Sequence, residues 1–201
     1  MHLKKSQKEI LEIFRKDIFT RKTIREISLE IKKDYPGVYN SVKELSKDNI
    51  IDIKKIGKSN LCELNLNPKT ISVLSFLDEQ EAFSKNIPNI NKILEFNEFL
   101  DEIIIVAGSY ASEKQTKKSD IDLVIITKEK AFEKQKLLEN LTSLMIPEIH
   151  AMVITQKDFI DMLHDKKPNF GKEIFKNRLL FRNASRYYQL IKEAVENGFR
   201  G

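Results

Sequence analysis

Apolar residues recur at helical spacing three times within the first 50 residues of the chain. The three sets are Ile10, Ile13 and Phe14, then Ile24, Ile27 and Ile31, and finally Val38, Val42 and Leu45. Because residues three and four apart share one face of a helix, the sets predict three short amphipathic helices. Thr23 and Glu26 have the spacing of a capping box before the second helix, and Tyr-Pro-Gly at 35–37 predicts a break before the third.

The period of the apolar pattern changes to two after residue 49, which is the period of a β-strand. The alternating apolar residues are Ile51 and Ile53 before a Gly-Lys-Ser turn at 57–59, and Cys62, Leu64 and Leu66 after it. Two alternating runs joined by a glycine-containing turn predict a β-hairpin.

Connecting helices and a sheet are predicted for the remainder of the chain. Residues 68–100 hold two segments that each begin at a proline and continue with helical apolar spacing. The apolar runs at 103–108 and 120–126 each predict a strand, and the family resemblance described below implies another at 148–155. The tail has apolar residues that we expect on helices packed against the sheet, namely Phe159, Met162, Ile174, Leu179, Phe181, Tyr188 and Ile191. The expected parts are therefore 1–67, 68–100 and 101–201.

Two aspartates, Asp120 and Asp122, lie within the apolar strand that follows Gly108 and Ser109 by a short loop. Side chains at i and i+2 of a strand point to the same face, so the two carboxylates lie side by side. A divalent cation between them relieves their repulsion, and oxygen ligands of this kind suit Mg²⁺ or Mn²⁺. The Gly-Ser turn brings backbone N–H groups and a hydroxyl within reach of phosphate oxygens. The pattern favours metal-assisted phosphoryl chemistry.

A strand, a Gly-Ser turn, a loop and an Asp-x-Asp strand together resemble the nucleotidyltransferase superfamily related to DNA polymerase β, and its minimal nucleotidyltransferases in particular. The resemblance implies that Gly108 and Ser109 bind a nucleoside triphosphate, expected to be ATP, and that Asp120 and Asp122 are catalytic ligands of Mg²⁺. It also implies nucleotidyl transfer to a protein hydroxyl, a nucleic-acid end or a small molecule. Similar minimal nucleotidyltransferases include antitoxins that modify a partner toxin, so a toxin is one candidate acceptor.

The chain departs from the family pattern in two places. The superfamily usually supplies a third carboxylate from the middle of a neighbouring strand, where this chain has His150 or Met152. Glu148 is therefore a displaced candidate for the catalytic acid, and His150 is a candidate substitute base. Family members often continue the Gly-Ser segment with Arg and Gly, whereas this chain has Ser112 and Glu113. The loop lysines that would replace the missing cation are Lys114, Lys117 and Lys118.

The net charge of +5 is concentrated in the first third of the chain. Residues 1–67 hold 15 Lys and Arg against 10 Asp and Glu, whereas residues 68–201 hold 20 of each. A concentrated excess of this kind is compatible with a polyanionic partner and also with a solvated, lysine-rich surface, and charge alone favours the solvated surface. Three helices followed by a hairpin resemble the winged helix-turn-helix family, which implies binding to duplex DNA. A winged helix used only for protein contacts or for homodimerisation is the alternative.

The third predicted helix and the hairpin carry the candidate DNA contacts. If the apolar face of that helix packs on the core, polar side chains lie on the opposite face, where ammonium groups suit phosphates and neutral groups suit base edges. The predicted DNA-binding residues are Tyr39, Asn40, Lys43 and Lys47 on the helix, and Lys54, Lys55 and Lys58 on the hairpin.

Several classes of protein are disfavoured. No stretch has the roughly 18 consecutive apolar residues of a membrane helix, and the first residues lack the apolar segment of a secretory signal. We therefore expect a cytoplasmic protein with no membrane partner. The single cysteine, Cys62, has no Cys or His at metal-ligand spacing and is interpreted as a buried apolar residue.

The patterns together predict an α+β or α/β chain, with an N-terminal winged helix followed by a mixed sheet flanked by helices. Two functions stay open. One is a nucleotidyltransferase with a DNA-binding module, and the other is a non-catalytic DNA-binding regulator whose second domain senses nucleotide.

Overall fold

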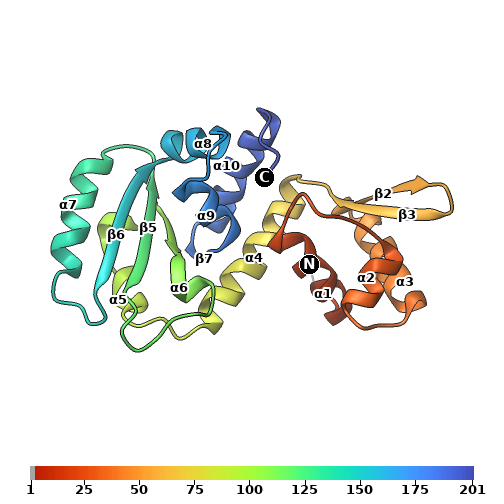
Figure 1. Cartoon of the computed structure of the whole chain (residues 1–201), viewed down its shortest axis with the longest axis horizontal. Helices are drawn as coiled ribbons and strands as arrows, with labels where there is room; N and C mark the ends of the chain where they lie inside the picture. The colour runs from red at the N-terminus through yellow and green to blue at the C-terminus, as the bar shows by residue number, and fades with distance from the viewer. Residues whose placement is uncertain (1–2) are drawn as a thin grey trace. The chain divides into compact units, whose positions relative to one another are not determined.

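The computed structural model describes residues 3–201 and divides into two compact units, Met1–Leu77 and Asp78–Gly201 (Figure 1). The division falls inside one helix, α4 (Pro68–Ser84), rather than at the start of the connecting segment at residue 68. Each unit has its own hydrophobic core, and each is described separately below.

The first unit consists of helices and a small antiparallel sheet. Its elements are α1 (Lys5–Lys16), β1 (Arg21–Thr23), α2 (Ile24–Glu30), α3 (Tyr35–Lys47), β2 (Ile51–Ile56) and β3 (Ser59–Leu64). The sheet order is β1-β3-β2, so the predicted hairpin forms the sheet together with a third, three-residue strand. The strand β1 was not predicted, because three residues are too few to show a period of two.

The predicted apolar faces form the core of the first unit. Ile10, Ile27, Val42 and Cys62 are fully buried and belong to one cluster, as the helical and strand periods predict. The predicted capping box is present, since Thr23 Oγ1 accepts from the Glu26 N–H and the Glu26 carboxylate accepts from the Thr23 N–H.

The predicted break at residues 35–37 is wrong, because α3 begins at Tyr35. Proline is tolerated in the first turn of a helix, where its missing N–H has no intrahelical partner to lose. Asp34 caps this end, and its carboxylate accepts from the Gly37 N–H at 2.9 Å. The Pro-Gly pair therefore lies in the first turn of the helix instead of interrupting the chain.

The second unit is a four-stranded mixed sheet between helices. After α4 its elements are α5 (Ile90–Leu94), the 3₁₀ helix η1 (Asn97–Phe99), β4 (Ile103–Val106), α6 (Gly108–Ala111), β5 (Ile121–Thr127), α7 (Ala131–Thr142), β6 (Ile149–Thr155), α8 (Gln156–His164), α9 (Phe170–Lys176), β7 (Leu179–Arg182) and α10 (Ala184–Glu196). The order is β6-β5-β4-β7, with β5 and β6 parallel and the other pairs antiparallel. This confirms the expected α+β class with a mixed sheet.

Helices cover both faces of this sheet. Leu123 and Ile125 point to the face where Ile90 of α5 and Leu138 of α7 pack. The opposite face contacts α8 and α10, whose Phe159 and Tyr187 rings lie 5.6 Å apart (Figure 1). Since strand side chains alternate between faces, Asp122 shares its face with Val124, on the α8 and α10 side of the sheet.

The edge strand β6 has part of its free backbone bound by a side chain of its own unit. Gln135 of α7 donates from Nε2 to the Ala151 carbonyl at 2.8 Å, and its Oε1 accepts from the Val153 N–H at 2.6 Å. The amide therefore occupies two of the backbone groups that a neighbouring strand would use.

Two predictions for the second unit need correction. Leu179 and Phe181 lie on the strand β7, not on a helix, because a four-residue buried strand has no visible period. The second helix predicted within 68–100 is divided into α5 and the 3₁₀ helix η1. Among the helices in residues 3–201, none is long and apolar enough to cross a membrane.

Candidate functional site

The turn after β4 brings its backbone directly against an aspartate of the next strand. Gly108 has a φ of 63°, in the left-handed region that favours glycine. A Cβ at this position would lie 1.8 Å from Oδ2 of Asp122, far inside van der Waals contact. Only glycine fits here, so residue 108 is set by the position of the Asp122 carboxylate.

The two aspartates lie at the beginning of β5. Asp120 immediately precedes the strand and Asp122 is its second residue, with side chains 42% and 39% exposed. The Asp122 carbonyl accepts from the Ala107 N–H at 2.9 Å, which joins the end of β4 to the start of β5. The carboxylates are therefore held by paired strands while their oxygens remain accessible to a ligand.

His150 is the side chain that β6 places beside both carboxylates. In the parallel register its Cα pairs with that of Asp122. Its Nε2 lies 3.6 Å from Oδ2 of Asp120, and its Nδ1 lies 3.9 Å from Oδ1 of Asp122. These distances exceed ordinary hydrogen-bond lengths, so the imidazole stands opposite the pair without a hydrogen bond to either carboxylate.

The other two candidates on this strand lie to either side of His150. Glu148 immediately precedes β6, is exposed, and its carbonyl accepts from the Ile121 N–H at 2.9 Å. Met152 pairs with Val124 and is 39% exposed. Within the described part of the chain, the near neighbour of the aspartates is thus an imidazole, while Glu148 contacts β5 through its backbone.

The donor atoms of the aspartates suit a divalent cation by their chemistry. Two half-exposed carboxylates at alternate positions of one strand are the kind of ligands that Mg²⁺ and Mn²⁺ prefer. Residues 3–201 contain no group of three or more His, Cys, Asp or Glu side chains arranged to hold a metal ion. Any metal at this site would therefore depend on the two aspartates and on the ligands that the substrate brings.

The segment after Gly108 is held by its own side chains. Ser109 is half-buried in the one-turn helix α6, and its carbonyl accepts from the Lys114 N–H at 2.9 Å. Ser112 Oγ donates to the Gly108 carbonyl at 3.0 Å. Glu113 forms an ion pair with Lys85, which the sequence did not predict because the two residues are far apart along the chain.

The loop lysines predicted to replace the missing phosphate-binding cation are exposed. Lys114, Lys117 and Lys118 lie between α6 and β5, where Ser119 Oγ accepts from the Thr116 N–H and shapes a turn. This loop connects the Gly-Ser turn to the aspartates, so its cations belong to the same end of the sheet.

The candidate DNA contacts lie on α3 and on the β2–β3 hairpin of the first unit. Asn40, Lys43 and Lys47 are exposed on α3, whereas Tyr39 packs partly against the core, with Lys43 Nζ 5.6 Å from its ring centroid. On the hairpin, Lys54 forms an ion pair with Glu63. The remaining two hairpin candidates, Lys55 and Lys58, are exposed.

A comparison with known proteins bears on the second unit. Residues 88–186 match the family model described as "Polymerase beta, Nucleotidyltransferase". The matched segment includes the Gly-Ser turn, both aspartates and the strand that carries His150. No curated protein and no solved structure matches the chain. Together with the mixed sheet, the family match supports the nucleotidyltransferase superfamily for residues 88–186.

Proposed function

We propose that the second unit transfers a nucleotidyl group from a nucleoside triphosphate, ATP in the first instance, to an acceptor. The observation that carries this proposal is the approach of Gly108 to the Asp122 carboxylate within a segment that matches a nucleotidyltransferase family. A backbone turn and two exposed carboxylates meet there at one end of the sheet. They are the two kinds of group that a metal-bound triphosphate requires.

Each residue of the site has a definite part in this proposal. Asp120 and Asp122 hold Mg²⁺, which neutralises charge on the triphosphate when it is bound. Ser109 Oγ and the neighbouring backbone N–H groups donate to phosphate oxygens. An acceptor hydroxyl attacks the α-phosphorus, its bond to phosphorus forms, the bond to the bridging oxygen breaks, and pyrophosphate leaves.

The acceptor's proton needs a base, and two residues compete for that part. His150 faces both carboxylates at 3.6 and 3.9 Å, whereas Glu148 lies two residues earlier and is exposed. The position of His150 makes it the stronger candidate, because a general base must stand within reach of the reacting group. Loss of transfer in His150→Ala with transfer retained in Glu148→Gln would separate the two.

The test is incubation with ATP labelled at the α-phosphorus and with Mg²⁺, in the presence of a cell extract that supplies acceptors. We expect label on a protein, a nucleic-acid end or a small molecule, and a toxin partner would be one protein acceptor. Asp120→Asn with Asp122→Asn should abolish labelling, while Asp101→Asn, an exposed aspartate before β4, should leave it unchanged. Labelling that survives in the double variant would refute the assignment.

A second function is favoured by the three helices and hairpin of the first unit, together with the excess of positive charge in the first third of the chain. We propose that the first unit binds duplex DNA as a winged helix, with Lys43 and Lys47 of α3 against phosphates. If the second unit binds nucleotide without transferring it, the chain is a DNA-binding regulator. The two carboxylates are compatible with either outcome, since residues 3–201 contain no group of three or more His, Cys, Asp or Glu side chains arranged to hold a metal ion.

Salt dependence tests the DNA proposal. Each phosphate contact releases counterions, so log affinity should fall with log salt by about 0.9 per contact. Lys43→Glu with Lys47→Glu should weaken binding to all sequences and flatten this slope. Asn40→Ala should chiefly reduce preference among sequences, by roughly 1–3 kcal/mol at the base that it contacts. An unchanged slope in the lysine variant would argue for protein contacts or homodimerisation instead.

A further inference from the structure

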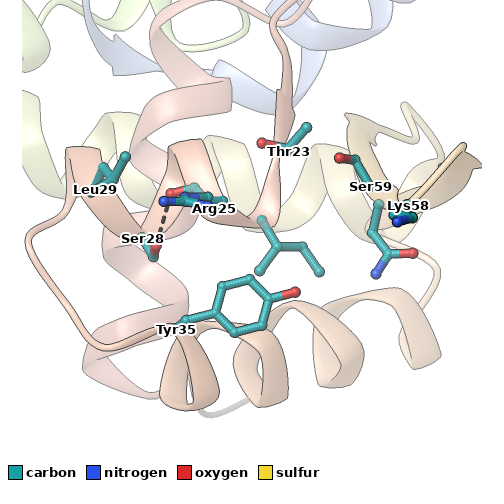
Figure 2. A pocket seen from close by; sticks show the side chains of 9 residues that line it. Thr23, Arg25, Ser28, Leu29, Tyr35, Lys58 and Ser59 are labelled. Atoms are coloured by element: carbon teal, nitrogen blue, oxygen red, sulfur yellow. Dashed lines mark hydrogen bonds between the residues drawn. The ribbon is translucent and has the colours of Figure 1, made fainter.

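The first unit contains a pocket that neither proposed function uses as a whole. It has a volume of about 620 Å³ and lies between α2, the first residue of α3 and the β2–β3 turn (Figure 2). The lining residues are Thr23, Ile24, Arg25, Ser28, Leu29, Tyr35, Lys58, Ser59 and Asn60. A volume of this size is within the range of small-molecule sites.

Three local structures bring these segments together. β1 pairs with β3 so that Thr23 lies opposite Leu61, which sets the end of the hairpin beside the start of α2. Gly57 turns the hairpin with a φ of 57°. Asp34 caps α3 and places Tyr35 at the first position of that helix, so that its ring points toward the pocket (Figure 2).

The pocket is positively charged. Arg25 and Lys58 line it, none of its lining residues is acidic, and within residues 3–201 neither cation forms an ion pair. Two other basic side chains of this unit, Lys22 and Lys54, are paired with Glu30 and Glu63.

The nearby carboxylates have other partners. Glu26 accepts from Thr23 and Asp34 accepts from Gly37. Two unpaired cations therefore face one concave surface, which favours an anionic ligand.

The same surface offers groups for a planar ring and for hydrogen bonds. The Tyr35 side chain is 45% exposed and stacks on Tyr39 with ring centroids 6.1 Å apart, which fixes its orientation. Leu29 is 70% exposed on the other side of the pocket. Ser59 and Asn60 contribute a hydroxyl and an amide. Aromatic rings of this kind stack on nucleobases, while guanidinium and ammonium groups bind phosphate.

We propose that this pocket binds one nucleotide, with its base against Tyr35 and with phosphate groups against Arg25 and Lys58, which lie on different sides of the pocket (Figure 2). The nucleotide is either free or part of a nucleic-acid strand, since both present the same phosphate and base. The proposal deepens the nucleic-acid role of the first unit and rests in part on it, because Lys58 belongs to both. It does not depend on nucleotidyl transfer, because none of the residues lining the pocket is an Asp or Glu that could hold a metal ion.

The test measures binding by the full chain in EDTA, which removes the Mg²⁺ that the proposed site of the second unit needs for binding. Calorimetry with ATP, a short oligothymidylate and a short duplex forms the three arms. We expect ATP or the oligothymidylate to bind, while the duplex arm reports on the winged-helix proposal. Arg25→Gln and Lys58→Gln should each weaken that binding by roughly tenfold or more, as expected for loss of a charge-assisted contact.

A matched control separates the pocket from general charge. Lys16→Gln removes one exposed cation at the end of α1, outside the pocket, and should change affinity by less than about twofold. Tyr35→Leu should weaken binding of ATP or oligothymidylate but leave the affinity for inorganic pyrophosphate unchanged, because pyrophosphate has no base. Amide NMR shifts on binding should be centred on Thr23, Ser28, Ser59 and Asn60.

The arms identify the source of the nucleotide. Binding of ATP identifies a free nucleotide as sufficient, whereas binding of oligothymidylate without binding of ATP identifies a single strand. Binding of the duplex alone would overturn the proposal, because paired and stacked bases are not free to contact Tyr35. The proposal is overturned if no arm binds in EDTA, if Lys16→Gln weakens binding as much as Arg25→Gln, or if the shifts lie outside the pocket. DNA binding that depends on Lys43 and Lys47 but not on Arg25 would leave the winged-helix proposal standing and remove this one.

Discussion

At the scale of single residues, the strongest constraint in the chain is the contact between Gly108 and Asp122. The sequence predicted both residues for the site, but for separate reasons: a flexible turn and a metal ligand. In the structure the two residues are in contact, and the Asp122 carboxylate can take its position because Gly108 has no Cβ. A side chain at residue 108 would therefore change the site as well as the turn.

Gly108→Ala tests this link, and Gly57→Ala is its matched control. Both glycines have positive φ, at 63° and 57°, but a Cβ at residue 57 meets nothing within 4 Å. The left-handed conformation alone should cost about 1–3 kcal/mol of unfolding free energy in either variant. Gly108→Ala should lower the unfolding free energy by more than Gly57→Ala does, because the Asp122 carboxylate must also move. Equal losses in urea denaturation would show that the Asp122 contact is unimportant.

The buried thiol of Cys62 should be unreactive in the folded chain. Burial raises the pKa of this thiol to about 11, although Lys43 opposes the shift. The folded state then holds its proton more tightly than the unfolded state, whose thiol titrates near 8.5. The contribution of this group to stability should be full below about pH 8.5 and should fall as the pH rises toward 11.

The measurement for Cys62 is its reaction with a disulfide reagent at pH 8. We expect negligible reaction in the native protein and rapid reaction after unfolding in urea. Rapid native reaction would mean that the first unit opens frequently, because the side chain is fully buried in the closed state.

At the scale of elements, α4, β7 and α10 are joined by a buried polar cluster. Tyr188 of α10 donates to the Asp78 carboxylate of α4 at 2.5 Å, and Arg178, just before β7, donates to the Tyr188 hydroxyl at 3.0 Å. The Arg178 guanidinium also lies 4.9 Å from the Tyr187 ring centroid. Burial raises the pKa of the Tyr188 hydroxyl well above its usual range, so this group remains a donor.

Removal of one charge from this cluster should strongly lower the free energy of unfolding. Asp78→Ala leaves the buried Arg178 without its counter-ion and should cost about 3–5 kcal/mol. Tyr188→Phe removes only a hydroxyl and should cost about 1–2 kcal/mol. Asp161→Ala, which breaks an exposed pair with Lys157, is the control and should change stability little. The melting temperatures of the three variants should follow this order, and a mild effect of Asp78→Ala would contradict the account.

The elements that the sequence predicted have either a period or, as at 103–106, a run of consecutive β-branched residues. Ile10 and Ile27 mark amphipathic helices, and Ile51 and Cys62 mark a hairpin, because one buried face imposes a repeat. The strands β1 and β7 are too short to show one, so Leu179 and Phe181 were assigned to helices. The aspartates were predicted from local spacing. His150 was named from its place on a neighbouring strand, but its distances to the aspartates and the pocket around Arg25 depend on strand register and on tertiary contacts, which local spacing does not contain.

At the scale of the whole molecule, the division between units lies within α4 and not at its start. Val73 and Leu77 belong to the core of the first unit, whereas Ala82 belongs to the core of the second. A single helix therefore supplies apolar side chains to two cores. The boundary expected at residue 67 would remove part of the first core.

Fragments test where the first unit ends. Residues 1–77 should fold cooperatively and melt at a higher temperature than residues 1–67, because the shorter fragment lacks Val73 and Leu77. Burial of each such side chain contributes about 1.5–3 kcal/mol. Circular dichroism on heating gives the comparison. Equal melting of the two fragments would place the boundary at the start of α4.

The hydrogen bonds of Gln135 have a consequence for how the protein behaves at high concentration. An exposed sheet edge is a template on which other chains add strands, and this is a common origin of aggregation. Near β6 the risk is greater, since Leu144 and Ile146 are 94% and 89% exposed in the preceding connection. The Gln135 amide occupies the Ala151 carbonyl and the Val153 N–H, so an incoming strand cannot form hydrogen bonds to these two groups. We therefore expect Gln135 of α7, through its bonds to β6, to limit the addition of strands from other chains at this edge.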